Sequence, residues 1–62
     1  MTKREARSIA RLYMEQGYSS YEEDLQEVAE DLRNSDYTQK EIDIIVKELF
    51  DLVEYSIYGY IH

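Results

Sequence analysis

Apolar residues recur every three to four positions in three segments of the chain, which is the spacing of a helix with one buried face. In residues 3–16 these positions are Ala6, Ile9, Ala10 and Tyr13. In residues 21–33 they are Tyr21, Leu25, Val28, Ala29 and Leu32. In residues 39–58 they are Ile42, Ile45, Val46, Leu49, Val53, Ser56 and Ile57. Period-two alternation never persists, so the pattern predicts an all-α protein, a compact three-helix domain whose third helix is the longest.

The predicted helices carry start and stop signals. Each start fits a capping box, in which a Ser or Thr is followed three residues later by Glu and the two side chains satisfy free backbone donors. The pairs are Thr2 with Glu5, Ser19 with Glu22 or Ser20 with Glu23, and Thr38 with Glu41. The stop signals are Gly17, the run Asn34-Ser35-Asp36, and Gly59. These signals support one domain over residues 1–62 with short connections.

The composition sets limits on this domain. The chain has 62 residues, a formal net charge of −7 and no Cys, so a disulfide framework or a zinc knuckle is excluded. No apolar run approaches the roughly 20 residues that span a bilayer, and no signal pattern follows Met1, so we expect a soluble, cytoplasmic protein without membrane contact. For so short a chain the favourable and unfavourable folding terms nearly cancel, which leaves room for extra burial against a partner or a second copy.

Groups that could support catalysis are scarce. The only imidazole belongs to His62, the last residue, where fraying makes a poor base or ligand. No Glu-x-x-His pair and no calcium-loop pattern is present, and Gly17 and Gly59 are isolated, so no glycine-rich loop can hold a phosphate. We therefore expect a protein that is not an enzyme, with no cofactor and no metal site.

The third predicted helix has apolar residues on more than one side. Ile44, Leu52 and Tyr55, with Tyr58 beside them, lie away from its predicted core face. One interpretation is a second contact face for another protein or for a homo-dimer. The alternative is that this helix is central and that the other two helices cover both of its flanks.

Seven tyrosines in 62 residues are a second unusual feature. Tyr13, Tyr21 and Tyr60 are assigned to core faces, whereas the outlying tyrosines are Tyr18, Tyr37, Tyr55 and Tyr58. Tyrosine combines a large apolar ring with a hydroxyl and is favoured at protein interfaces. The outlying tyrosines are therefore either half-buried boundary residues or anchors for a partner, and four of them together favour binding.

Charge is distributed unevenly along the chain. Residues 1–12 hold four basic residues against one acid, a net charge of +3, and the other fifty hold three against thirteen, a net charge of −10. The basic residues that share one side of the first helix are Arg4, Arg7 and Arg11, and the outer arc of the second helix consists of Glu23, Asp24, Glu27, Glu30 and Asp31. This arc is either a solvated face that pairs loosely with the basic helix, or a carboxylate row that resembles a phosphate row to a basic partner.

These features favour a small acidic protein-binding module. In size, acidity, tyrosine content and lack of chemistry the chain resembles the small accessory and inhibitor proteins of phages and mobile elements, some of which imitate DNA. The leading hypothesis is an inhibitor or accessory factor that engages a basic, nucleic-acid-handling protein through the acids on the outer arc of the second helix and the outlying tyrosines. The alternative is a homo-oligomeric regulator or adaptor that uses Ile44, Leu52 and Tyr55. Direct DNA binding through Arg4, Arg7 and Arg11 comes third, because the helix after the first turn is the most acidic part of the chain.

Overall fold

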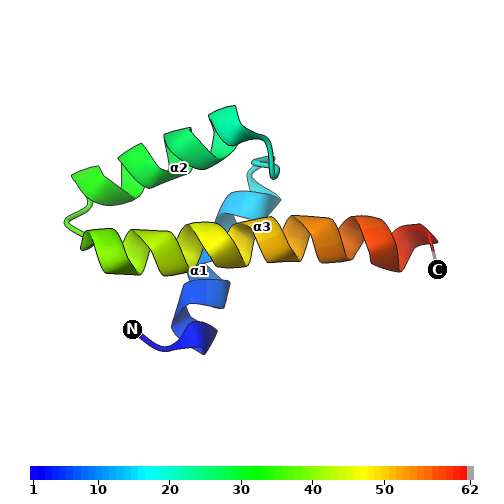
Figure 1. The fold of residues 1–62 in the computed structure, drawn as a ribbon, viewed down its shortest axis with the longest axis horizontal. Helices are drawn as coiled ribbons and strands as arrows, with labels where there is room; N and C mark the ends of the chain where they lie inside the picture. Colours follow the sequence, from blue (N-terminus) through cyan, green and yellow to red (C-terminus); the bar gives the residue numbers. More distant parts are fainter. Residues whose placement is uncertain (62) are drawn as a thin grey trace.

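The computed structural model describes the backbone of residues 1–61 and the side chains of residues 1–55. It contains three helices, α1 (Lys3–Glu15), α2 (Glu22–Asn34) and α3 (Gln39–Ile61) (Figure 1). Helix α3 has 23 residues and the others have 13 each, and no strand occurs in residues 1–61. The predicted all-α three-helix fold, with the third helix longest, is confirmed, although α3 continues past its predicted stop at Gly59.

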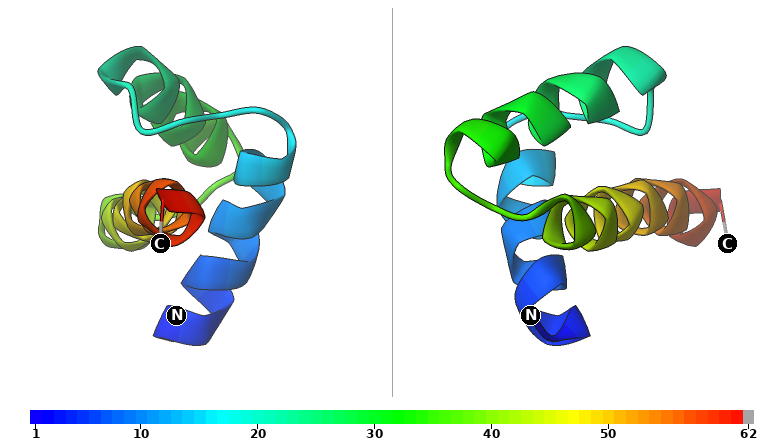
Figure 2. Two further views of the ribbon diagram at one scale, coloured as in Figure 1. Left: turned by 90° about the vertical axis from the view of Figure 1, so that its right-hand side faces the viewer. Right: turned by 60° about the vertical axis from the view of Figure 1, so that its left-hand side comes forward.

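Helices α2 and α3 lie side by side and antiparallel, and α1 crosses α3 at a steep angle (Figures 1 and 2). The core lies where the three helices meet and consists of Ala6, Ala10, Val28, Leu32, Ile42, Ile45 and Leu49. All seven were predicted from periodicity. The small side chains of Ala6 and Ala10 let the α1 backbone approach α3 closely, and the C-terminal part of α3 projects beyond the other two helices (Figure 1).

The capping box of α3 is complete, and that of α1 is half formed, by its Thr2 side chain. Thr2 Oγ1 accepts a hydrogen bond of 3.2 Å from the backbone N–H of Glu5. Thr38 and Glu41 make the reciprocal pair, with the Thr38 N–H donating to Glu41 Oε1 at 2.9 Å and the Glu41 N–H donating to Thr38 Oγ1 at 3.2 Å. The Thr38 N–H and the Thr38 hydroxyl both donate to Glu41 Oε1, and these two bonds lower the pKa of the Glu41 carboxyl because they favour its charged form.

The predicted capping box of α2 is wrong. The residue before its first turn is Tyr21, in an extended conformation and without a side-chain cap bond. Ser19 instead donates to Asp24, inside the first turn, from both its hydroxyl (2.6 Å) and its backbone N–H (3.0 Å). Because Tyr21 lies in the connection rather than on the helix face, its side chain is 75% exposed, and its assignment to the core is also wrong.

Helices α1 and α2 end in the same way. Residue 17 is a glycine with φ +102° and residue 36 is an aspartate with φ +68°. In each case the residue after the left-handed position donates back to the third-last helical carbonyl, Tyr18 to Tyr13 and Tyr37 to Leu32, both at 3.2 Å. This is the Schellman arrangement, so the predicted stops at Gly17 and around Asp36 are confirmed.

Candidate functional site

Five of the six acidic residues of α2 lie on one side of the helix. We call Glu23, Asp24, Glu27, Glu30 and Asp31 the acidic surface; all five lie on α2, four of them exposed and Asp24 half-buried. The four exposed carboxylates are spread over about 12 Å of helix axis, one for each roughly 4 Å. One DNA strand carries a phosphate for each 3.4 Å or so of its axis. The linear charge density of the acidic surface is therefore close to that of a single DNA strand.

Two tyrosines of the neighbouring segment hold carboxylates of the acidic surface. The Tyr13 hydroxyl donates a hydrogen bond to Asp31 Oδ2, and the Tyr18 hydroxyl donates to Glu27 Oε1 at 3.3 Å. The two rings pack edge to face, with centroids 5.6 Å apart. Loss of solvent around the rings, together with the nearby carboxylates, raises the pKa of both hydroxyls. A tyrosine hydroxyl with its ordinary pKa of about 10 is protonated at neutral pH, and the raised pKa lets both hydroxyls keep donating at more alkaline pH.

Asp24 is held by the connection between α1 and α2. Its Oδ2 accepts the two bonds from Ser19, which lower the pKa of the Asp24 carboxyl. With Glu27 and Asp31, three of the five acids are thus tied to Ser19 and to the two tyrosines. This role of Tyr13 and Ser19 was not predicted from the sequence. The available signal was the position of Tyr13 and Tyr18, four residues before and one residue after the stop at Gly17, next to the segment that leads to α2.

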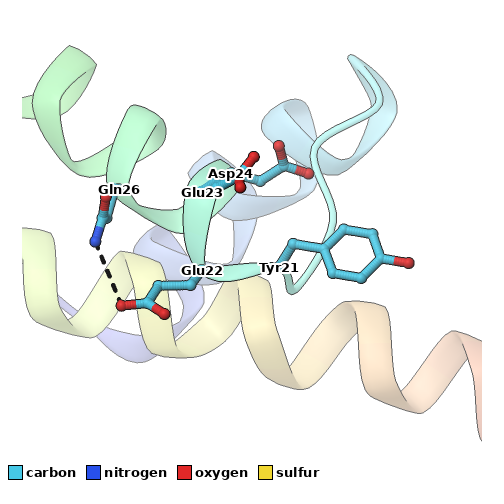
Figure 3. Close-up of a pocket in the computed structure, with 5 residues that line it drawn as sticks. All are labelled: Tyr21, Glu22, Glu23, Asp24 and Gln26. Carbon is cyan, nitrogen blue, oxygen red and sulfur yellow. Dashed lines mark hydrogen bonds between the residues drawn. The ribbon is translucent and has the colours of Figure 1, made fainter.

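Two surface depressions border these side chains. One, of about 430 Å³, is lined by Tyr21, Glu22, Glu23, Asp24 and Gln26. Figure 3 shows the Tyr21 ring pointing away from α2 and the Glu22 carboxylate accepting from the Gln26 amide, a bond of 3.4 Å. The other, of about 190 Å³, is lined by Tyr18, Glu27, Glu30, Asp31 and Asn34. Both are lined mainly by acids and tyrosines, a combination that suits cationic side chains with an aliphatic stem.

The basic residues of α1 do not neutralise the acidic surface. Arg4, Arg7 and Arg11 are all exposed, and Arg7 pairs with Glu48 of α3, Nε to Oε2, at 3.8 Å. Among the side chains of residues 1–55, no Lys or Arg nitrogen lies within 4 Å of an oxygen of the acidic surface. The described side chains therefore show no ion pair between the acidic surface and the basic residues of α1.

Glu48 is a buried charged residue that the sequence analysis did not single out. It is only 4% exposed where α1 crosses α3, and its Oε2 has no hydrogen-bond donor among the described residues. Apolar residues at positions 45, 49 and 52 surround it in sequence, and this was the available signal that it faces inward. The half-exposed guanidinium of Arg7 is its compensating charge.

The outlying tyrosines have different environments. Tyr18 and Tyr37 are half-buried and pack against the core, which matches the boundary interpretation for these two. Tyr55 is 77% exposed. The side chains of Tyr58 and Tyr60 lie outside the described residues.

The second apolar face of α3 is divided between two grooves. Leu52 and Tyr55 line one with Arg7, Arg11, Met14 and Asp51. Ile44 lines the other with Met1, Lys3, Lys47, Glu48 and Asp51. Ile44 and Leu52 are half-buried and also touch the core. The structure therefore brings Leu52 together with Tyr55 but places Ile44 in a different groove.

No group of three or more Asp, Glu or His side chains within the described part of the chain is arranged to hold a metal ion. In the same part, no helix combines the length and apolar character needed to cross a membrane.

The chain matches no protein-family model, no curated protein and no solved structure.

Proposed function

We propose that this protein is a non-enzymatic binding module whose acidic surface engages a basic, nucleic-acid-handling protein, as an inhibitor or accessory factor of the kind that phages and mobile elements encode. The observation that carries this proposal is the exposed carboxylate row on α2, which makes no ion pair within 4 Å with a Lys or Arg of residues 1–55. A protein that normally binds phosphates would meet a similar density of negative charge here.

The second support is the fixed position of part of this row. Asp24, Glu27 and Asp31 accept hydrogen bonds from Ser19, Tyr18 and Tyr13. A carboxylate already held in place loses less side-chain entropy when a guanidinium or ammonium group binds it. Like charges three or four residues apart also repel by a few tenths of a kcal/mol per pair, a cost that a cationic partner would remove.

The test begins with capture of partners on the immobilised protein from cells that carry its gene. The proposal expects a partner that also binds duplex DNA, and expects the protein to displace duplex DNA from it in a competition assay. Affinity should fall as salt rises, because the contact is electrostatic.

The decisive variant is the triple change Glu23→Gln, Glu27→Gln and Glu30→Gln, which keeps side-chain size and one acceptor oxygen per residue but removes three charges. We expect it to weaken binding at least tenfold and to flatten the salt dependence. The matched control is Glu15→Gln, Asp36→Asn and Asp43→Asn, three exposed acids outside the acidic surface. If both triple variants bind like the wild type, the acidic surface is not the contact.

A further inference from the structure

A groove between α1 and the C-terminal half of α3 combines exposed apolar surface with both signs of charge. Its volume is about 410 Å³, and it is lined by Arg7, Arg11, Met14, Asp51, Leu52 and Tyr55; we call it the α1–α3 groove. The Tyr55 ring stands at its edge, 77% exposed, whereas Met14 and Leu52 are half-buried. The centre is thus apolar and the rim is charged, which is the arrangement of a protein interface.

The chain also exposes more surface than its mass requires. Its accessible area is 4774 Å², whereas a compact monomer of this mass exposes about 4,200 Å². Among the described side chains, Arg11, Asp51 and Tyr55 are exposed residues that line the α1–α3 groove. A stable dimer covers about 800 Å² on each partner, and the groove together with its exposed rim residues would contribute to that area.

We propose that the α1–α3 groove is a two-fold interface between two copies of this chain. In a two-fold interface the same patch meets itself, so it must carry both members of each complementary pair. The groove meets this condition, because Arg11 on α1 and Asp51 on α3 are both exposed. Neither has an ionic partner within 4 Å among the side chains of residues 1–55. In the dimer, Arg11 of each copy pairs with Asp51 of the other, around Leu52 and Tyr55.

Charge favours a second copy over other occupants. The groove lies between the basic flank of α1 and an acid of α3, so a uniformly acidic or basic ligand would meet one repulsive wall. The groove shares no residue with the acidic surface, so the dimer keeps two copies of that surface free. The dimer therefore stands or falls independently of the function proposed above.

The test compares the wild type with two charge-reversal variants, Arg11→Glu and Asp51→Arg, by sedimentation equilibrium at micromolar to high micromolar concentrations. Each variant alone places like charges at both pairs of the dimer, so we expect its dimer dissociation constant to rise at least about tenfold. An equimolar mixture of the two variants allows a dimer with one copy of each. In that dimer the two substituted side chains form one pair of opposite charges, and the native Arg11 and Asp51 form the other, so the mixture should recover the dimer mass.

Recovery in the mixture shows that the charges meet between copies rather than within one. Arg4→Glu is the matched control, because it reverses an exposed arginine of α1 outside the groove; it should sediment like the wild type. Tyr55→Ser, at a position that is mostly exposed in the monomer, should weaken the dimer while circular dichroism shows unchanged helicity. A wild type that stays monomeric at high micromolar concentration, or a mixture that stays monomeric while the wild type dimerises, overturns the proposal.

Discussion

Replacing Glu48 by leucine is expected to raise the free energy of unfolding. Glu48 is 4% exposed, one of its oxygens has no donor among the described residues, and its compensating charge on Arg7 lies 3.8 Å away. The substitution removes a charge that folding must strip of water and puts an apolar side chain of similar volume between α1 and α3. Replacing a whole buried ion pair by apolar side chains often leaves a protein equally or more stable, whereas removing one partner destabilises when the other charge stays buried. Here the remaining charge on Arg7 is 49% exposed and stays in contact with water.

The size of the effect follows from three terms. At 3.8 Å the attraction between the two charges is about 4 kcal/mol for an effective dielectric constant of about 20. The Arg7 side chain is 49% exposed, so solvent screening reduces this to about 1 kcal/mol. Removing a carboxylate from water costs several kcal/mol. Apolar replacements of buried ion pairs stabilise by up to about 4 kcal/mol. We expect Glu48→Leu to lie in the lower half of that range, at about 1 to 2 kcal/mol, because Arg7 loses its partner; this is about 4–16 °C in Tm for a domain of this size.

The assay is thermal and urea unfolding followed by circular dichroism at one fixed protein concentration. Asp43→Leu is the control, because it removes an exposed acid of the same helix and should change stability by no more than about 0.5 kcal/mol. Arg7→Met, which leaves the Glu48 carboxylate uncompensated, should destabilise the wild type but not the Glu48→Leu variant. A loss of more than about 1 kcal/mol in Glu48→Leu would show that the carboxylate stabilises the fold, which contradicts this reasoning.

Three further predictions concern the helix ends and the tyrosine contacts. Asp36→Gly should raise the free energy of unfolding by about 1 kcal/mol in urea titrations, because glycine adopts the φ of +68° at this position without the penalty of a β-carbon; an unchanged midpoint would count against strain there. Thr38→Ala should cost about 1 kcal/mol at pH 7 through loss of the cap. The lowered pKa of Glu41 stabilises the fold above its unfolded pKa of about 4.3, and this part is lost as pH falls. Thr38→Ala keeps the backbone N–H donor to Glu41, which is the larger cause, and removes only the hydroxyl donor. The loss from Thr38→Ala should therefore shrink slightly at pH 3, and a larger loss at pH 3 than at pH 7 refutes the linkage. The raised pKa of Tyr13 contributes stability that is fully present below about pH 10 and is lost as pH rises further. The free energy of unfolding of Tyr13→Phe should therefore fall less steeply with pH above about pH 10 than that of the wild type, and the same pH dependence in both proteins would contradict this.

Local sequence was sufficient to predict the features whose hydrogen bonds are made within one short segment. The capping pairs at Thr2 and Thr38 and the turn at Gly17 depend on residues within about five positions, so composition and spacing alone identify them. The residues of the core follow from the 100° helical repeat, because an apolar stripe has to be buried whatever covers it. The acidic surface is likewise a property of spacing along α2.

Pairings between segments could not be read from the chain. The sequence signal assigned Ser19 to a capping box, but the path of the connection puts its hydroxyl on Asp24 and leaves Tyr21 in solvent. The hydrogen bonds of Tyr13 and Tyr18 to α2 depend on where α2 packs beside α1. A helical repeat assigns each residue an angle on its own helix but does not say which neighbour lies at that angle.

The crossing of α1 over α3 shows what only the tertiary structure decided. From the sequence, Ile44, Leu52 and Tyr55 form one apolar side of α3, and Glu48 lies among them on the same side. In the fold, α1 covers Glu48. Ile44 and Leu52 line different grooves, and Leu52 and Tyr55 share theirs with two arginines of α1. The sequence determines which faces are apolar or charged, because that depends on side-chain chemistry and a fixed repeat. The crossing angle decides which of those faces meet, because it depends on contacts summed over the whole core.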